Sequence, residues 1–122
     1  MKKLLIAAAA LALAPATAFA ADESGVWTVN GDFGGAVTYS IKCTLKEDAA
    51  GAVTGSCTDP QGGSDPQIKS GTATATSVEF KYDTTYQGSP ISLDYKGDIQ
   101  PDGSLKGTID AGGPQGTFTA TR

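Results

Sequence analysis

The sequence predicts an all-β fold, in which eight antiparallel strands run up and down and close into a small β-barrel with one disulfide. Two observations predict it: short runs in which apolar and polar residues alternate, and turns rich in Gly or Pro between these runs. The run from Val37 to Lys46 is the clearest, with every odd position apolar and every even position polar. Side chains of a strand alternate between two faces, so each run has one dry face and one wet face. A sheet of such strands buries its apolar side by curling over it.

The first 20 residues are predicted to be a secretory signal peptide. Met1–Lys3 is a basic start, Leu4–Ala14 is an apolar run, and Ala18–Ala20 fits the small-x-small cleavage rule. Cleavage after this motif leaves residues 21–122 as one β-barrel domain, which we expect in the periplasm or the extracellular medium. A membrane anchor is the alternative. It is disfavoured because the apolar run is too short to span a bilayer and Pro15 interrupts it, so no membrane attachment is expected after cleavage.

Acidic residues outnumber basic ones in the predicted mature chain. Removing Lys2 and Lys3 leaves 7 basic against 13 acidic residues, a net charge of −6. Such a chain would be repelled by a phosphate backbone or an anionic membrane surface, so nucleic acid and lipid head groups are not expected as partners. The simpler interpretation is that the acidity keeps a small exported protein soluble.

Both cysteines follow the predicted signal peptide, in a part of the chain that is expected to be oxidised. Cys43 lies on the apolar face of its run, and Cys57 lies on the apolar face of the next run. The Ala49–Gly51 link favours a hairpin whose register sets Cys43 opposite Cys57. Cysteines placed opposite each other on one face can be bridged without moving the backbone. We expect a structural disulfide rather than a redox pair, because there is no Cys-x-x-Cys spacing and no basic neighbour to lower a thiol pKa.

Eight strands are predicted, separated by links that contain turn-forming residues. They are Val26–Val29, Ala36–Lys46, Ala52–Thr58, Gln67–Ala75, Ser77–Asp83, Pro90–Ile99, Ser104–Asp110 and Gly116–Thr121. Links this short favour pairing between strands that are consecutive in the sequence. The sequence leaves open whether the first and last strands meet to close the ring, and it leaves the oligomeric state open as well.

Charged residues predict the register of two hairpins, because opposite charges are favoured across a strand pair. The expected pairs are Glu79–Lys96, Phe80–Tyr95, Lys81–Asp94, Tyr82–Leu93, Asp98–Lys106 and Ile99–Leu105. Slipping the first hairpin by two residues would set Glu79 opposite Asp94, a contact between like charges. We interpret these charged residues as a solvated sheet face rather than as a catalytic cluster.

Glycine recurs inside the predicted strands, at Gly55, Gly71, Gly97, Gly107 and Gly116. Glycine weakens a strand, so its repeated use needs an explanation. Three explanations are open. The strands of a small barrel must bend sharply, aromatic rings need room to lie across the backbone, or the barrel contains a cavity that holds a ligand.

The sequence gives little support for catalysis. It contains no His, which removes the Ser-His-Asp arrangement and the usual zinc and copper sites. Gly62–Gly63 lacks the Lys-Ser/Thr ending of a phosphate-binding loop. Asp32, Asp59 and Asp65 do not match the spacing of a calcium loop. We therefore expect no enzymatic activity, no metal and no cofactor.

Aromatic residues are the remaining candidates for a functional site. Phe33 and Tyr86 fall in predicted loops, where exposed rings often serve as binding anchors. The alternative is that they are lids folded over an end of the barrel. An open pocket lined by aromatic residues of the dry faces would favour a small-molecule ligand. The tentative ligand-binding residues are Phe33, Tyr39, Phe80, Tyr82, Tyr86 and Tyr95.

Gly25-Val26-Trp27, at the start of the first strand, resembles the Gly-x-Trp motif of the lipocalin and avidin group, the calycin-type barrels. In that group the Trp closes one end of the barrel, and an Arg from the final strand region packs on it. The resemblance implies that Arg122 makes a cation–π contact with Trp27. This chain differs in having shorter strands and no helix after the barrel. No residues match the biotin-contacting set of the avidins, so the resemblance supplies no ligand.

Two functions from different classes follow from these observations. The first is an exported, non-catalytic binding module for a small apolar or sugar-like ligand. The second is a protein-interaction module, such as a protease inhibitor or a structural envelope protein, that would use the loops Asn30–Gly35 and Asp59–Pro66. Small exported protease inhibitors built on similar barrels are included in the resemblance. An open pocket would favour the first function, and a filled barrel interior would favour the second.

Overall fold

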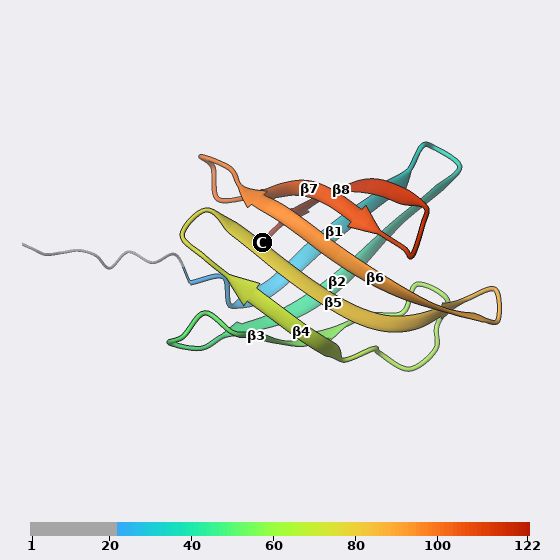
Figure 1. Ribbon diagram of the computed structural model, residues 1–122, viewed down its shortest axis with the longest axis horizontal. Helices are drawn as coiled ribbons and strands as arrows, with labels where there is room; N and C mark the ends of the chain where they lie inside the picture. Colours follow the sequence, from blue (N-terminus) through green and yellow to red (C-terminus); the bar gives the residue numbers. More distant parts are fainter. Residues whose placement is uncertain (1–21) are drawn as a thin grey trace, which may run out of the picture.

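Eight antiparallel strands wrap into a single barrel, which confirms the predicted fold class (Figure 1). The structure, a computed structural model, describes residues 22–122, so the predicted signal peptide and its cleavage site lie outside the described residues. The strands are β1 (Gly25–Phe33), β2 (Val37–Glu47), β3 (Val53–Cys57), β4 (Ile68–Ala73), β5 (Ser77–Tyr86), β6 (Ser89–Ile99), β7 (Leu105–Asp110) and β8 (Gln115–Thr121). Within the described range, no helix has the length and apolarity needed to cross a membrane.

The first and last strands meet, and the seam of the barrel falls elsewhere. The strands follow the order β3-β2-β1-β8-β7-β6-β5-β4, and β1 pairs with β8 over five residue pairs. Only the isolated bridges Ala52–Thr72 and Ser56–Gln67 join β3 to β4, on either side of a bulge in β4. The barrel is therefore nearly closed, with its weakest junction between these two strands.

The registers predicted for the β5–β6 and β6–β7 hairpins are confirmed. The charged residues that predicted them do not form ion pairs. Among residues 22–122 the one salt bridge joins Lys69 Nζ to Asp83 Oδ2 at 3.0 Å, and both side chains are about half exposed. On the inner face, by contrast, the rings of Phe80 and Tyr95 stack with centroids 4.7 Å apart. Packing inside the barrel therefore fixes the register, since a one-residue slip would turn every apolar side chain outward.

Two strands are longer than predicted, which corrects the positions of two candidate residues. Phe33 and Tyr86 lie at the ends of β1 and β5, not in loops. In β1 the apparent turn signal at Gly31 serves packing instead, because a Cβ placed there would lie 2.5 Å from Cζ of Tyr39. The β5–β6 turn is reduced to Gln87 and Gly88, both with positive φ, the form that fits the twist of a two-residue hairpin. The other strand ends differ from the prediction by at most two residues.

Aromatic rings lie against two of the five glycines predicted inside strands, Gly97 and Gly116. A Cβ on Gly97 would lie 2.8 Å from Cζ of Phe118, and one on Gly116 would lie 2.9 Å from Cδ1 of Phe33. Any larger residue at these positions would collide with a ring that crosses the backbone. Of the three explanations left open by the sequence, room for rings therefore applies at these positions.

The predicted disulfide joins Cys43 of β2 to Cys57 of β3, which are directly opposite each other. Their Cα atoms are 4.0 Å apart, and both residues are buried inside the barrel. Beside the bridge, Lys42 and Thr58 exchange two hydrogen bonds, from Lys42 N to Thr58 Oγ1 and from Thr58 N to Lys42 O. The disulfide thus secures β3, the strand that borders the seam, to the continuous part of the sheet.

Trp27, which is buried, and the segment that precedes β1 close one end of the barrel, and this segment enters β1 at the left of Figure 1. Nε1 of Trp27 donates a hydrogen bond to the carbonyl oxygen of Glu23 at 2.9 Å. The guanidinium of Arg122 lies over the Trp27 ring, 4.5 Å from its centroid, so the contact implied by the resemblance is present. Nη1 of Arg122 also donates to the carbonyl oxygens of Asp22 and Ser24, which holds this segment across the barrel end.

Removing the disulfide is expected to destabilise the protein without changing its fold. The bridge spans a sequence separation of 14 residues. For a closed loop of this size, the pair Cys43→Ala and Cys57→Ala should lower the free energy of unfolding by about 3 kcal/mol, measured by urea denaturation. Thr44→Ala, on the outer face of the same strand, is the control and should change it by less than about 0.5 kcal/mol. Detection of free thiols in the unreduced, unfolded protein would contradict the bridge.

Truncation of the buried Trp27 is expected to lower the stability of the protein strongly, because its ring fills the closed end of the barrel. Trp27→Ala should lower the free energy of unfolding by about 3–5 kcal/mol. Arg122→Gln removes the contact with the ring but leaves the ring in place, so the loss should be about 1 kcal/mol. Both values can be measured by urea denaturation. A nearly neutral Trp27→Ala variant would show that the ring does not close the barrel.

Candidate ligand-binding site

A cavity of about 640 Å³ opens at the end of the barrel opposite Trp27. The links β1–β2, β3–β4, β5–β6 and β7–β8 surround it, at the right of Figure 1. Most of the lining residues are apolar or aromatic. They are Phe33, Ala36, Val37, Thr38, Tyr39, Thr58, Asp59, Pro60, Gln61, Pro66, Tyr82, Thr84, Thr85, Tyr86, Ile91, Leu93, Ala111 and Pro114.

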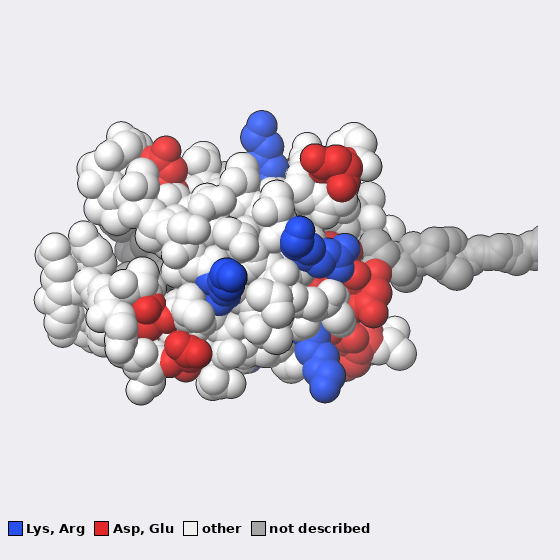
Figure 2. Space-filling model, turned by 180° about the vertical axis from the view of Figure 1, so that it is seen from behind, with Lys and Arg blue, Asp and Glu red and all other residues white. Residues whose placement is uncertain are grey.

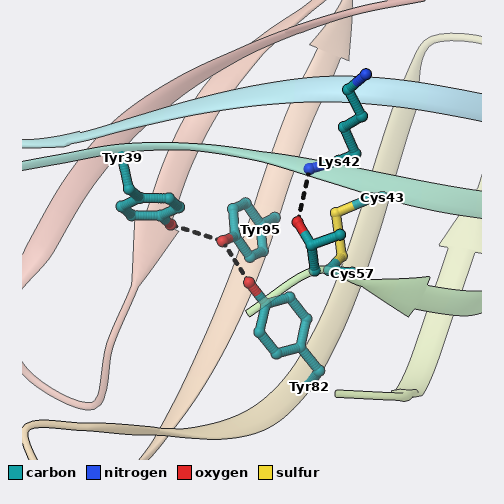
Figure 3. The surroundings of a disulfide bond; sticks show 7 residues. Tyr39, Lys42, Cys43, Cys57, Tyr82 and Tyr95 are labelled. Atoms are coloured by element: carbon teal, nitrogen blue, oxygen red, sulfur yellow. Dashed lines mark hydrogen bonds between the residues drawn. A yellow bond between two sulfur atoms is a disulfide. The ribbon is translucent and has the colours of Figure 1, made fainter. Parts of the chain in front are cut away.

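Three tyrosines from different strands meet at the floor of this cavity, and their hydroxyl groups form a chain (Figure 3). Tyr39 comes from β2, Tyr82 from β5 and Tyr95 from β6. The hydroxyl oxygen of Tyr95 lies 2.6 Å from that of Tyr39 and 2.8 Å from that of Tyr82. Tyr39 and Tyr82 line the cavity, whereas Tyr95 lies beneath them and is fully buried.

The ring of Tyr95 is held by aromatic contacts on two sides. Phe80 stacks on it with centroids 4.7 Å apart, and Phe118 meets it edge-on with centroids 5.2 Å apart. At the rim, Phe33 stacks on Tyr39 with centroids 6.5 Å apart. These packed rings fix the positions of the hydroxyl groups, since a buried ring in contact on several sides has little freedom to move.

All three phenols remain neutral well above physiological pH. Burial raises the pKa of Tyr95, and the neighbouring Tyr82 and Tyr39 phenols raise this pKa further. Burial also raises the pKa of Tyr82 and that of Tyr39, while the hydrogen bond to Tyr95 partly offsets the rise for each of them. The chain of tyrosine hydroxyl groups therefore presents uncharged hydroxyl groups to the cavity rather than a phenolate.

The β3–β4 link forms one wall of the cavity and is folded around Asp59. Oδ1 of Asp59 accepts a hydrogen bond from Gln61 N at 2.9 Å, and Oδ2 accepts one from Gly63 N at 3.0 Å. Asp side chains commonly stabilise turns in this way. The far end of the link is secured by a hydrogen bond from Cys57 N to the carbonyl oxygen of Pro66. The carboxylate of Asp59 is thus occupied with its own loop.

Of the four links around the cavity, the β3–β4 link contains Asp59 and Asp65, the ends of β1 and β7 add Asp32 and Asp110, and none of the four links contains Lys or Arg. Figure 2 shows the molecule from behind, with this end at the left, and the outermost part of that end carries uncharged and acidic atoms. In the β1–β2 turn, Oδ1 of Asp32 accepts a hydrogen bond from Gly35 N, and in the β7–β8 turn Oδ1 of Asp110 accepts one from Gly112 N. The rim is therefore acidic, and its charges are used to shape turns.

The structure brings four of the six tentative ligand-binding residues to the cavity. Phe33, Tyr39, Tyr82 and Tyr86 line it, whereas Phe80 and Tyr95 lie beneath it as packed core. Phe80 is not a lining residue because it sits one step deeper on β5 than Tyr82, on the same inner face.

Several lining residues are not among the candidates predicted from the sequence, and they include Ile91, Leu93 and Pro60. Ile91 and Leu93 lie on the inner face of β6, near the end that follows the β5–β6 turn. Their alternation with polar residues was visible in the sequence, but it did not distinguish the cavity from the core. Pro60 lies in the β3–β4 link, where no pattern points inward.

Beyond the cavity, the described residues offer neither a second pocket nor a metal site that is a stronger candidate for a functional site. A more open depression of about 510 Å³ lies on the outer wall of β1, β2 and β8. Its lining includes Asn30, Asp32, Ser40 and Thr119, which are exposed polar residues. Residues 22–122 contain no group of three or more His, Cys, Asp or Glu side chains placed to hold a metal ion.

Comparisons of the chain with protein-family models, with curated proteins and with solved structures find no match. Kinship with the calycin-type barrels therefore remains a hypothesis. It rests on the eight-strand meander and on the contact between Arg122 and Trp27.

The buried phenols predict a loss of stability at alkaline pH. The folded pKa values of Tyr39, Tyr82 and Tyr95 lie above the ordinary value of 10.0, so their contribution to stability is complete below pH 10.0 and is lost above it. The unfolded chain releases phenolic protons there that the folded chain retains. Urea denaturation between about pH 8 and pH 11 should show the free energy of unfolding falling above about pH 10. A variant with Phe at all three positions should lose this part of the fall, and an unchanged profile would contradict the assignment.

Proposed function

We propose that this protein is an exported, non-catalytic binding module that holds a small apolar ligand in the mouth of its barrel. The observation that carries the proposal is the cavity of about 640 Å³. Pockets that bind small molecules commonly measure about 300–1,000 Å³ and have mostly apolar walls with a few polar groups. This cavity has both properties.

Construction of the cavity also supports a binding role. Its floor is rigid, because Tyr95 is packed between Phe80 and Phe118. Its rim is formed by links and strand ends, including Tyr86, whose side chain is 40% exposed. A rigid floor with exposed rings at the rim is an arrangement that many ligand sites share, since the scaffold positions the site and the loops select the ligand.

An apolar ligand is favoured over a sugar-like one. A sugar presents hydroxyl groups on most sides, and each one that is buried needs a hydrogen-bond partner. Ile91, Leu93, Val37 and Pro60 give large parts of the wall no such group. The polar side chains in the wall are those of four Thr residues, three Tyr residues, Gln61 and Asp59, and the Asp59 carboxylate is engaged by its own loop.

The rival function, a protein-interaction module, has less support. It was expected to accompany a filled interior, whereas only the half of the barrel nearest Trp27 is packed. Export and an oxidising compartment, periplasmic or extracellular, form part of the proposal. The buried disulfide between Cys43 and Cys57 is compatible with them, because such bonds persist outside the cytoplasm.

Binding can be tested with the uncharged fluorescent probe N-phenyl-1-naphthylamine, whose emission rises in an apolar site. The native protein should bind it with a saturable signal. Ile91→Trp, which places a large ring in the cavity, should weaken binding at least about tenfold. Thr84→Phe, directly across from Ile91 on β5, fills the same space independently and should act in the same direction.

The matched control for these variants is Val26→Trp. Val26 lies on the outer wall near the closed end and is 54% exposed, so a ring there leaves the cavity unchanged. Binding to this variant should equal binding to the native protein. Loss of the signal in all three variants, or no saturable signal with the native protein, would contradict a ligand site in the mouth.

A further inference from the structure

We infer that the ligand is an uncharged, largely apolar molecule with an acceptor oxygen, such as that of a ketone, ester or ether, and that this oxygen accepts a hydrogen bond from the Tyr39–Tyr95–Tyr82 hydroxyl chain. This inference rests on the proposed function and specifies the ligand class for the same cavity. Three observations carry it: the number of protons in the chain, the position of its two ends and the charges around the cavity.

The hydroxyl chain has one more proton than it uses. Three phenols carry three hydroxyl protons, and two oxygen–oxygen contacts consume two of them. Tyr95 is 0% exposed, so a proton of its own that pointed away from both neighbours would be a buried, unsatisfied donor, which is costly. Tyr95 therefore accepts from one neighbour and donates to the other. The neighbour that receives this bond still has its own proton to donate.

The remaining proton is always at a residue of the cavity wall. It belongs to Tyr39 or to Tyr82, according to the direction in which the chain runs, and both residues line the cavity. Neither hydroxyl has another hydrogen-bond partner among the described residues. Whichever direction the hydroxyl chain takes, it offers one neutral donor at the floor of a mostly apolar space. The complementary group on a ligand is an acceptor oxygen.

The charges around the cavity exclude an anion as the preferred ligand. The lining contains the Asp59 carboxylate and no Lys or Arg. Among the four links of the rim, the β3–β4 link is the one with charged residues, and these are Asp59 and Asp65. A carboxylate ligand would have to leave water without a cation to meet it, which is unfavourable. A neutral oxygen that needs one donor fits the site without this cost.

The test compares three ligands of nearly equal size by their displacement of N-phenyl-1-naphthylamine. Valerophenone and pentylbenzene differ only in a carbonyl that replaces a CH₂ group, and 5-phenylpentanoate carries a carboxylate. With the native protein, the ketone should bind about 2- to 10-fold more tightly than the hydrocarbon, the range expected for one net hydrogen bond. The carboxylate should bind at least about tenfold more weakly than the ketone.

Two variants separate the hydroxyl groups that face the cavity from the one beneath it. Tyr39→Phe, Tyr82→Phe and Tyr95→Phe in one protein remove the whole chain and leave no buried phenol without a partner. The ketone should then lose its advantage and bind no more tightly than the hydrocarbon, because its buried oxygen has no donor, while both still displace the probe. Tyr95→Phe alone is the control: it removes one hydroxyl but keeps those of Tyr39 and Tyr82, so the preference for the ketone should persist.

The possible outcomes distinguish this inference from the proposal beneath it. Equal affinity of the native protein for ketone and hydrocarbon, a preference that survives in the triple Phe variant, or a preference for the carboxylate would each overturn the inference and leave the binding module standing. Failure of the native protein to bind the probe and all three ligands would overturn both. If the tyrosines had only a structural role, their replacement by Phe would lower the stability of the protein without changing the ratio of the affinities for the ketone and the hydrocarbon.

Discussion

Packing around Tyr95 divides the barrel into a filled half and an open half. Its ring is held between Phe80 and Phe118, and its hydroxyl group binds those of Tyr39 and Tyr82. On one side of this layer, aliphatic and aromatic side chains fill the interior as far as Trp27. On the other side the interior is hollow. In a domain this small, the closed half has to supply most of the buried apolar surface, and the aromatic layer lets the other half remain open.

Much of the fold could be predicted from the sequence because the side chains of a strand alternate between its two faces, with a period of two residues. Alternation identified the inner faces, and a hairpin of known length then fixed Cys43 opposite Cys57. The closure of the ring could not be predicted in this way. Pairing of β1 with β8 joins segments nearly ninety residues apart, such as Asn30 and Thr119, and no local pattern signals it. The seam between β3 and β4 was hidden for the same reason.

The candidate site was only partly predictable, since alternation gives the face of a residue but not its depth. Tyr82 and Phe80 have the same pattern in the sequence, yet Tyr82 lines the cavity and Phe80 lies below it. Depth depends on the tilt and stagger of neighbouring strands, which are set by closure of the whole barrel. Turn propensity was also misleading at Gly31, where the missing side chain makes room for the ring of Tyr39.

The up-and-down connectivity sends every second link to the same end of the molecule. The β1–β2, β3–β4, β5–β6 and β7–β8 links therefore crowd around the cavity, while the Trp27 closure lies at the other end of the barrel. Surface links tolerate changes of length and composition far better than packed strands do. These four links can accordingly change in length and composition while the strands that support them keep their pairing, which makes the scaffold suitable for engineering at its open end.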